Sequence, residues 1–157
     1  MLRNSFAAVL ICVLLSSCLK APKCEYDPCA YVAPSAEVQA LQSYITSNSI
    51  VATQHCSGVF YSIVTQGSGK APEACSNILV RYKGMLTNGT VFDESTTGVY
   101  FSLGNLIPAW RNVLPFLKTG GKMMIYVPPY LGYGNQQNGT IPPNSILVFE
   151  IDLDAVQ

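Results

Sequence analysis

Phe101-Ser-Leu-Gly-Asn-Leu-Ile-Pro-Ala-Trp110, continuing to Gly121, is the segment from which the architecture follows. Pro108 suits the first turn of a helix, where the missing N–H of proline costs nothing. Apolar residues then recur at helical spacing: Trp110, Val113, Leu114 and Leu117. Pro115 should tighten the helix or end it early, and Gly120-Gly121 offers a left-handed stop. This segment therefore predicts one short helix.

A helix this short is marginal in isolation, so it must pack against another element. Nearly all of the chain from Gly58 onward has the pattern of β-strands. The simplest arrangement is an α+β fold in which a twisted antiparallel sheet wraps around the helix. Trp110 should then point into the concave face of the sheet, either as a core residue or as the floor of a pocket.

The expected strands alternate apolar and polar residues and are bounded by turn residues. Asn88-Gly89 is a strong hairpin signal between two of them, and Pro128-Pro129 ends another. The strand segments are 59–64, 78–83, a return strand starting at 90, a separate short strand at 100–103, 122–127 and 147–153.

A second helix is expected ahead of the strands. Ser35 can cap it, Glu37 lies in its first turn, and the residues from Thr46 to Ser49 end it. Its apolar stripe consists of Val38, Leu41 and Ile45. This helix could pack on the domain or form a dimer contact, and the sequence does not distinguish the two.

The composition excludes some classes of function. The chain has 157 residues, 11% of them charged, with a formal net charge of +0 and no run of Lys or Arg, which argues against a nucleic-acid partner. The single histidine, His55, has no evident ligand partners in the sequence, so a histidine-based metal site is not expected.

The first residues resemble a targeting segment. Arg3 precedes an apolar run from Phe6 to Leu15 that is too short to span a bilayer. Leu15-Ser-Ser-Cys18 matches a bacterial lipobox, in which the cysteine receives lipid. We therefore expect a signal peptide at 1–17, a tether and helix at 18–57 and a folded domain at 58–157. The protein should be lipid-anchored in the cell envelope, facing the periplasm, at the outer membrane.

Four cysteines remain for an oxidising compartment: Cys24, Cys29, Cys56 and Cys75. Of the three possible pairings, we favour Cys24 with Cys29 and Cys56 with Cys75, because each closes a local connection. A zinc site is the alternative, but the sequence has no C-x-x-C motif to support it.

Motifs for nucleophilic catalysis or phosphate binding are absent from the sequence. Instead, separate segments supply aromatic residues and one acid: Tyr82, Phe92-Asp93, Trp110, Tyr133 and Phe149. Each aromatic residue alone is explained by a core position. Their order along the chain, however, points to a shared site.

The order of these segments resembles the FKBP family of peptidyl-prolyl cis-trans isomerases. The matching motifs are Val80-Arg-Tyr82-Lys-Gly84, Asn88-Gly-Thr-Val-Phe92-Asp93, Phe101-Ser-Leu103, Ile107-Pro-Ala-Trp110, Gly120-Gly-Lys122, Val127-Pro-Pro-Tyr-Leu-Gly-Tyr133, Ile141-Pro-Pro and Leu147-Val-Phe149-Glu. The resemblance covers roughly residues 58–153 and implies a sheet wrapped around a short helix.

The resemblance also implies a proline-binding pocket. Its walls would be Tyr82, Phe92, Leu106, Ile107, Trp110 and Phe149. Asp93 and Tyr133 would stand at the rim, and the backbone N–H of Ile141 would hold the substrate carbonyl. Two departures concern the pocket: Val99 or Tyr100 falls where the family has another wall aromatic, and Ala109 replaces a glycine.

The expected function is acceleration of X–Pro rotation in proline-containing, unfolded or newly secreted proteins, without a cofactor or a metal. Asp93 should affect the rate, by holding the twisted geometry of the substrate or by orienting a neighbouring side chain. The alternative is a structural ion pair with Arg81. Two alternatives remain: a proline-peptide-binding chaperone with little turnover, and a structural lipoprotein whose pocket has no role. The sequence does not give the oligomeric state.

Overall fold

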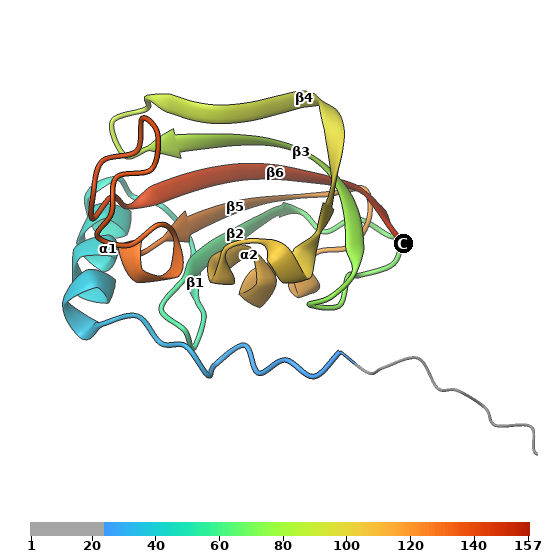
Figure 1. The fold of residues 1–157 in the computed structure, drawn as a ribbon, viewed down its shortest axis with the longest axis horizontal. Coiled ribbons are helices and arrows are strands. Elements are labelled where there is room, and N and C mark those ends of the chain that lie inside the picture. Colours follow the sequence, from blue (N-terminus) through green and yellow to red (C-terminus); the bar gives the residue numbers. More distant parts are fainter. Residues whose placement is uncertain (1–23) are drawn as a thin grey trace, which may run out of the picture.

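We describe residues 24–157 from a computed structural model of the chain (Figure 1). The expected signal peptide at 1–17 and the lipid-acceptor Cys18 lie outside the described residues. Within the described part, no helix is both long and apolar enough to cross a bilayer.

The centre of the fold is a six-stranded antiparallel sheet, whose long strands run across the view in Figure 1. Its strand order is β1-β2-β5-β6-β3-β4. The strands are β1 (Thr53–Gln54), β2 (Phe60–Thr65), β3 (Asn77–Leu86), β4 (Val91–Ser102), β5 (Gly121–Val127) and β6 (Leu147–Val156). This confirms the predicted fold class.

Helix α2 (Pro108–Val113) lies in the concave face of the sheet, and the short 3₁₀ helix η2 (Leu114–Phe116) follows it directly. The predicted tightening at Pro115 is confirmed, since that residue is in η2. The predicted stop at Gly120 is wrong, because η2 has already ended at Phe116. Gly120 is left-handed (φ +82°) in the turn that leads into β5.

Strand β5 shows how the sheet separates two apolar clusters. Met123, Ile125 and Val127 pack with α2, whereas Met124 and Tyr126 face the other way. Side chains alternate between faces along a strand, so this division follows from the sequence. Strand β6 alternates in the same manner, as predicted.

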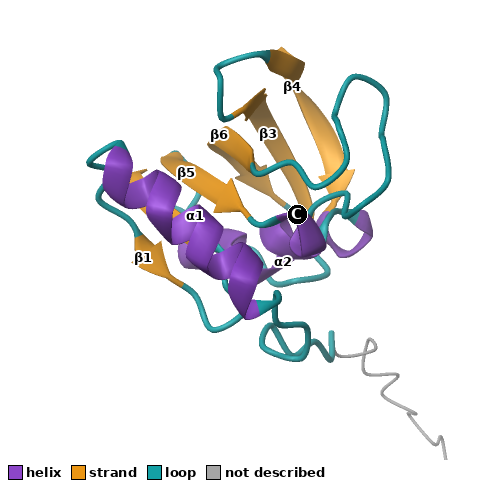
Figure 2. Ribbon diagram, turned by 90° about the vertical axis from the view of Figure 1, so that its left-hand side faces the viewer, coloured by secondary structure: helices purple, strands orange, loops and turns teal. Residues whose placement is uncertain are grey.

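Helix α1 (Ser35–Ser47) covers part of the second face (Figure 2). Leu41 and Ile45 are buried there against apolar side chains of the sheet: Phe60, Tyr126 and Val148. Of the two roles that the sequence left open, packing on the domain is the one that the structure contains. The predicted cap is wrong, since Pro34 occupies the N-cap position and Ser35 is already helical.

The hairpin at Asn88-Gly89 joins β3 and β4 as predicted, with Gly89 at φ +84°. The separate strand expected at 100–103 is not separate. Residues 100–102 are the end of β4, which stays paired with β3 through two shifts of register, and Leu103 opens the 3₁₀ helix η1 (Leu103–Asn105). A bulged strand has a broken alternation pattern, which is why the sequence suggested two strands.

The disulfides join Cys24 to Cys75 and Cys29 to Cys56, with Cα–Cα distances of 5.8 and 5.7 Å. The favoured local pairing is therefore wrong. The segment before α1 runs back along the domain, where the N–H of Ala33 donates to the Ser57 carbonyl at 2.9 Å. This path brings each cysteine of the segment to a distant partner, 51 and 27 residues away along the chain.

We expect Leu41→Ala to lower the free energy of unfolding by about 2–5 kcal/mol, because the Leu41 side chain is fully buried between α1 and the sheet. Urea unfolding followed by Trp110 fluorescence measures the effect, since the only tryptophan lies on the other face of the sheet. Val51→Ala is the matched control, because Val51 is 90% exposed. An unchanged Trp110 transition in Leu41→Ala would show that α1 and the sheet do not unfold together.

Candidate functional site: an aromatic pocket beside helix α2

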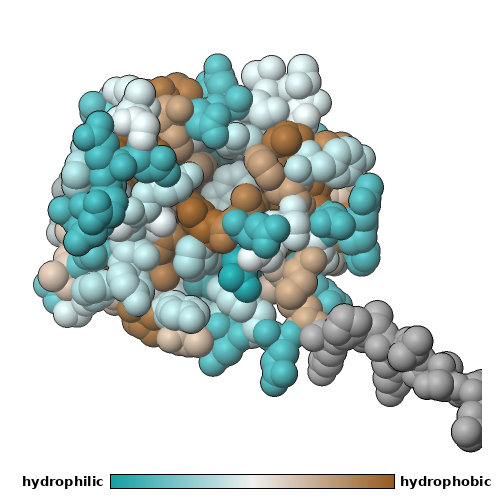
Figure 3. Space-filling view, viewed as in Figure 1, coloured by the Kyte–Doolittle hydropathy of each residue, from teal (hydrophilic) through white to brown (hydrophobic). Residues whose placement is uncertain are grey.

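A cavity of about 200 Å³ opens on the concave side of the sheet. It is lined by Tyr82, Asp93, Phe101, Leu106, Ile107, Trp110, Tyr133 and Phe149. Strands β3, β4 and β6 supply part of the lining, the segment from η1 into α2 supplies another part, and Tyr133 comes from the loop that follows the 3₁₀ helix at Pro129–Leu131. Figure 3 shows apolar side chains near the centre of this face, surrounded by polar ones.

Trp110 forms the floor and is 4% exposed. Three rings meet it edge-on: Tyr82 at 5.5 Å, Phe149 at 5.3 Å and Phe101 at 6.4 Å between centroids, with interplanar angles of 79°, 87° and 82°. Edge-to-face contacts of this kind are favourable beyond the area that they bury. The pocket therefore has rigid, apolar walls.

The only acid of the pocket lining, Asp93, is held by a tyrosine. The Tyr82 hydroxyl donates a hydrogen bond of 2.6 Å to Asp93 Oδ2. Burial raises the pKa of Tyr82 above its usual value, and the hydrogen bond to Asp93 raises it further. The alternative prediction of an ion pair between Asp93 and Arg81 is wrong, because the Arg81 guanidinium instead donates two hydrogen bonds, of 2.8 and 2.9 Å, to the Asp154 carboxylate.

Tyr133 stands at the opening and is 37% exposed. Burial raises the pKa of Tyr133, and the charge of Asp93 adds to the increase. Both phenols are thus neutral at physiological pH. The Tyr82 O–H is already donated to Asp93, whereas the Tyr133 O–H remains available as a donor at the opening.

Helix α1 contacts the segment that carries Tyr133. Glu37 Oε2 accepts the backbone N–H of Tyr130 at 2.8 Å. Tyr130 belongs to the 3₁₀ helix η3 (Pro129–Leu131), which ends two residues before Tyr133. A residue on the second face of the sheet therefore supports the rim of the pocket.

The backbone donor expected at Ile141 is already used. The N–H of Ile141 donates to the Asn138 carbonyl at 2.9 Å, and Ile141 is not part of the pocket lining. Ile107, which does line the pocket, has a backbone N–H for which the described residues supply no hydrogen-bond acceptor. This geometry makes Ile107 the better donor for a bound carbonyl.

Phe92, which the sequence placed in the wall, is not among the residues that line the cavity. Its ring packs edge-on against Phe149 at 5.6 Å and covers Gly84, where an added Cβ would come within 2.5 Å of that ring. Phe101 is the wall residue that the sequence reasoning missed. It follows Val99 at the strand period of two, so it supplies the aromatic ring expected near that position, while Tyr100 is 58% exposed.

The sheet wrapped around α2 and the aromatic pocket are together typical of one class of protein, and the comparison with protein families identifies that class. Residues 68–154, more than half of the chain, match the family model described as FKBP-type peptidyl-prolyl cis-trans isomerase. The chain belongs to this family.

Bacterial proteins are among the relatives of the chain. The chain is 41% identical over 99 residues to the FKBP-type peptidyl-prolyl cis-trans isomerase FkpA of Escherichia coli, covering 61% of this chain and 37% of that protein. The crystal structure of that FkpA superposes with a TM-score of 0.70 at 35% identity, over 78% of this chain and 61% of the other. The crystal structure of a peptidyl-prolyl cis-trans isomerase from Pseudomonas syringae superposes with a TM-score of 0.69 at 32% identity, over 80% of this chain and 97% of that one. The chain thus spans well under half of the curated FkpA.

Replacing Asp93 with Asn should lower the pKa of Tyr82, because the nearby negative charge no longer opposes formation of the phenolate. The pKa should stay above that of a free tyrosine, since burial is the larger cause and remains. Titration of the Tyr82 ¹³Cζ resonance measures this. Glu94→Gln on the same strand is the control, and equal Tyr82 titrations in the two variants would contradict the assignment.

Proposed function

We propose that this protein is a peptidyl-prolyl cis-trans isomerase that accelerates rotation of X–Pro bonds in polypeptides. The observation that carries the proposal is a preformed aromatic cavity whose floor is Trp110 and whose mouth holds one carboxylate. A volume of about 200 Å³ accommodates a pyrrolidine ring with part of the preceding residue. Family membership supports the same activity.

The reaction makes modest chemical demands on the protein. The barrier to rotation about the peptide bond comes from amide resonance and is about 18–20 kcal/mol. Since no covalent bond breaks, neither a nucleophile nor a metal is required. The protein must bind the twisted amide more tightly than the planar one.

The walls of the pocket supply one part of this preference. A planar amide is more charge-separated than a twisted one, so moving it from water into an apolar cavity disfavours the planar form. Trp110, Phe101 and Phe149 exclude water around the proline ring and hold it in place. The substrate chain can then rotate on the other side of the bond.

Polar groups at the edge supply the other part. The Ile107 N–H is placed to hold the carbonyl on the fixed side of the substrate. Asp93 fixes the Tyr82 ring through the 2.6 Å hydrogen bond, and Tyr133 offers a hydroxyl at the opening. We assign positioning to Asp93 and substrate contact to Tyr82, Tyr133 and the three wall aromatics.

Phe101→Ala should lower kcat/KM for an X–Pro peptide about tenfold, the effect of losing roughly 1.4 kcal/mol of contact with the proline ring. Tyr100→Ala, on the exposed side of the same strand, should leave kcat/KM unchanged. A stopped-flow isomerisation assay on a proline peptide measures both variants. Equal losses in the two variants would contradict the assigned wall.

A proline-peptide clamp is the competing function, because the same cavity would bind proline without turnover. The two functions are separated by measuring binding and rate on one sample. Quenching of Trp110 fluorescence by the peptide together with faster isomerisation supports the enzyme. Quenching with an unchanged rate would establish the clamp and overturn our proposal.

We further propose that the mature protein is lipid-anchored through Cys18 in the bacterial cell envelope and acts on proline-containing secreted proteins. The support is the Leu15-Ser-Ser-Cys18 pattern and the two disulfides, which suit an oxidising compartment.

Cys18→Ser should abolish incorporation of labelled palmitate and release the protein from membranes in a bacterial host. Cys12→Ser, within the expected signal peptide, should retain both the label and the membrane association. Labelling followed by membrane fractionation checks the prediction. Label retained in Cys18→Ser would exclude the anchor.

A further inference from the structure

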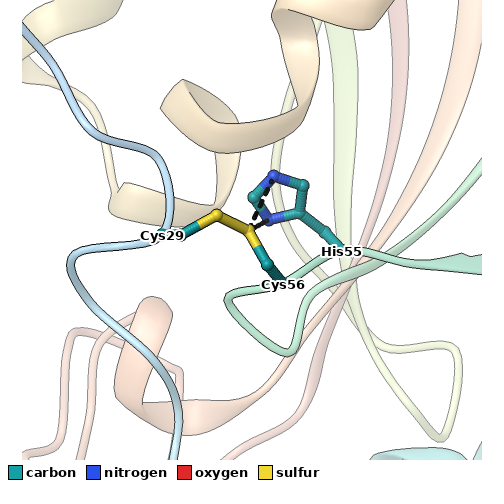
Figure 4. A group of neighbouring side chains, drawn as sticks. All are labelled: Cys29, His55 and Cys56. Carbon is teal, nitrogen blue, oxygen red and sulfur yellow. Dashed lines mark hydrogen bonds between the residues drawn. A yellow bond between two sulfur atoms is a disulfide. The ribbon is translucent and has the colours of Figure 1, made fainter.

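His55 is a buried imidazole that the aromatic pocket does not use. It is 8% exposed and lies against the Cys29–Cys56 disulfide, as Figure 4 shows. Both of its nitrogens approach Cys56 Sγ, Nε2 at 3.6 Å and Nδ1 at 3.7 Å. It is the only histidine of the chain, so the Cys24–Cys75 disulfide has no comparable neighbour.

Ser57 determines which nitrogen of His55 carries the proton. The Ser57 backbone N–H donates to Nδ1 at 3.2 Å, and the Ser57 hydroxyl is 2.9 Å from the same atom. A nitrogen that accepts hydrogen bonds holds a lone pair, so the neutral ring carries its proton on Nε2. Burial lowers the pKa of His55, which favours this neutral form. The Nε2–H thus lies beside Cys56 Sγ without pointing at it, because the sulfur is almost equally far from both ring nitrogens.

The two sulfurs of this disulfide differ in their surroundings. The backbone N–H of Cys29 donates to Asp27 Oδ1 at 2.9 Å, which holds a carboxylate against the backbone of Cys29. Cys56 instead has a neutral imidazole whose Nε2 lies 3.6 Å from its sulfur, so a thiolate released on Cys56 can turn toward the Nε2–H. A negative charge disfavours a thiolate and a hydrogen-bond donor favours it. Cys56 is therefore the better leaving group of the pair.

The disulfide is also accessible. Cys29 and Cys56 are both exposed, whereas His55 beneath them is buried. Both cysteines lie in surface turns, closed by the hydrogen bonds from the Ala30 N–H to the Asp27 carbonyl and from the Gly58 N–H to the His55 carbonyl. An incoming thiolate can reach the sulfurs without opening the sheet. Exposed disulfides are the ones that exchange.

We propose that Cys29–Cys56 is a thiol–disulfide exchange site that oxidises a pair of thiols in a polypeptide substrate. A substrate thiolate attacks Cys29 Sγ, forming a substrate–Cys29 disulfide and breaking the Cys29–Cys56 bond. The electron pair leaves on Cys56, whose thiolate accepts the Nε2–H hydrogen bond of His55 and then takes up the proton that the substrate thiol released.

The second substrate thiolate completes the exchange. It attacks the substrate sulfur of the mixed disulfide, so the substrate gains an internal disulfide and Cys29 leaves as a thiolate. The substrate is oxidised by two electrons, and the Cys29–Cys56 pair is reduced by two. Each chain therefore oxidises one dithiol.

The test uses the oxidised full chain with reduced glutathione as the thiol, followed by alkylation and peptide mass spectrometry. We expect Cys29–Cys56 to open at least tenfold faster than Cys24–Cys75, which serves as the internal control, with glutathione found on Cys29. A peptide with two cysteines should be oxidised at one equivalent per chain. Equal opening rates of the two disulfides would overturn the proposal.

Two variants test the role of the neighbours. His55→Phe keeps a ring but removes the donor, and it should slow the opening of Cys29–Cys56 about tenfold while Cys24–Cys75 is unaffected. Asp27→Asn, at an exposed position, should move part of the glutathione from Cys29 to Cys56 because the charge that separates the two sulfurs is gone. If neither the rate in the first variant nor the distribution in the second changes, the proposal is wrong.

Discussion

Burial of one indole ring in the concave face of the sheet is the contact on which the structure depends. Helix α2 has six residues and would not persist alone, so the sheet must hold it through Trp110 and the apolar residues that follow. The same ring forms the floor of the pocket. Folding and binding therefore rely on the same contacts, and a substitution that loosens α2 affects both.

Sequence patterns predicted the secondary structure correctly wherever neighbouring residues determine it. Pro108 at the start of α2, the alternation in β5 and β6, and the turn at Asn88-Gly89 all follow from neighbouring residues, and all are present. The pocket residues Tyr82, Asp93 and Trp110 also come together as expected. The positions of Tyr82 and Asp93 rest on strand register, which the hydrophobic pattern specifies strongly when one face is buried.

Patterns failed where long-range geometry decides. The β3–β4 pairing contains two register shifts, so the sequence does not show which side chains of β4 reach the cavity: Phe101 lines it, whereas Phe92 packs against Phe149. The use of the Ile141 N–H by Asn138 depends on a loop conformation that residue types do not specify. The disulfide pairing depends on the return path of the segment before α1, which loop length does not predict.

The contact between Glu37 and the Tyr130 N–H has a wider meaning for how such chains are compared. Helix α1 lies outside residues 68–154, the part that the family model recognises, yet it braces the segment that leads to Tyr133. Accessory helices of this type are part of the structure that forms the binding pocket and are not merely spacers. Two relatives with identical pocket linings can therefore differ in ligand preference through an element that an alignment of their shared domain omits.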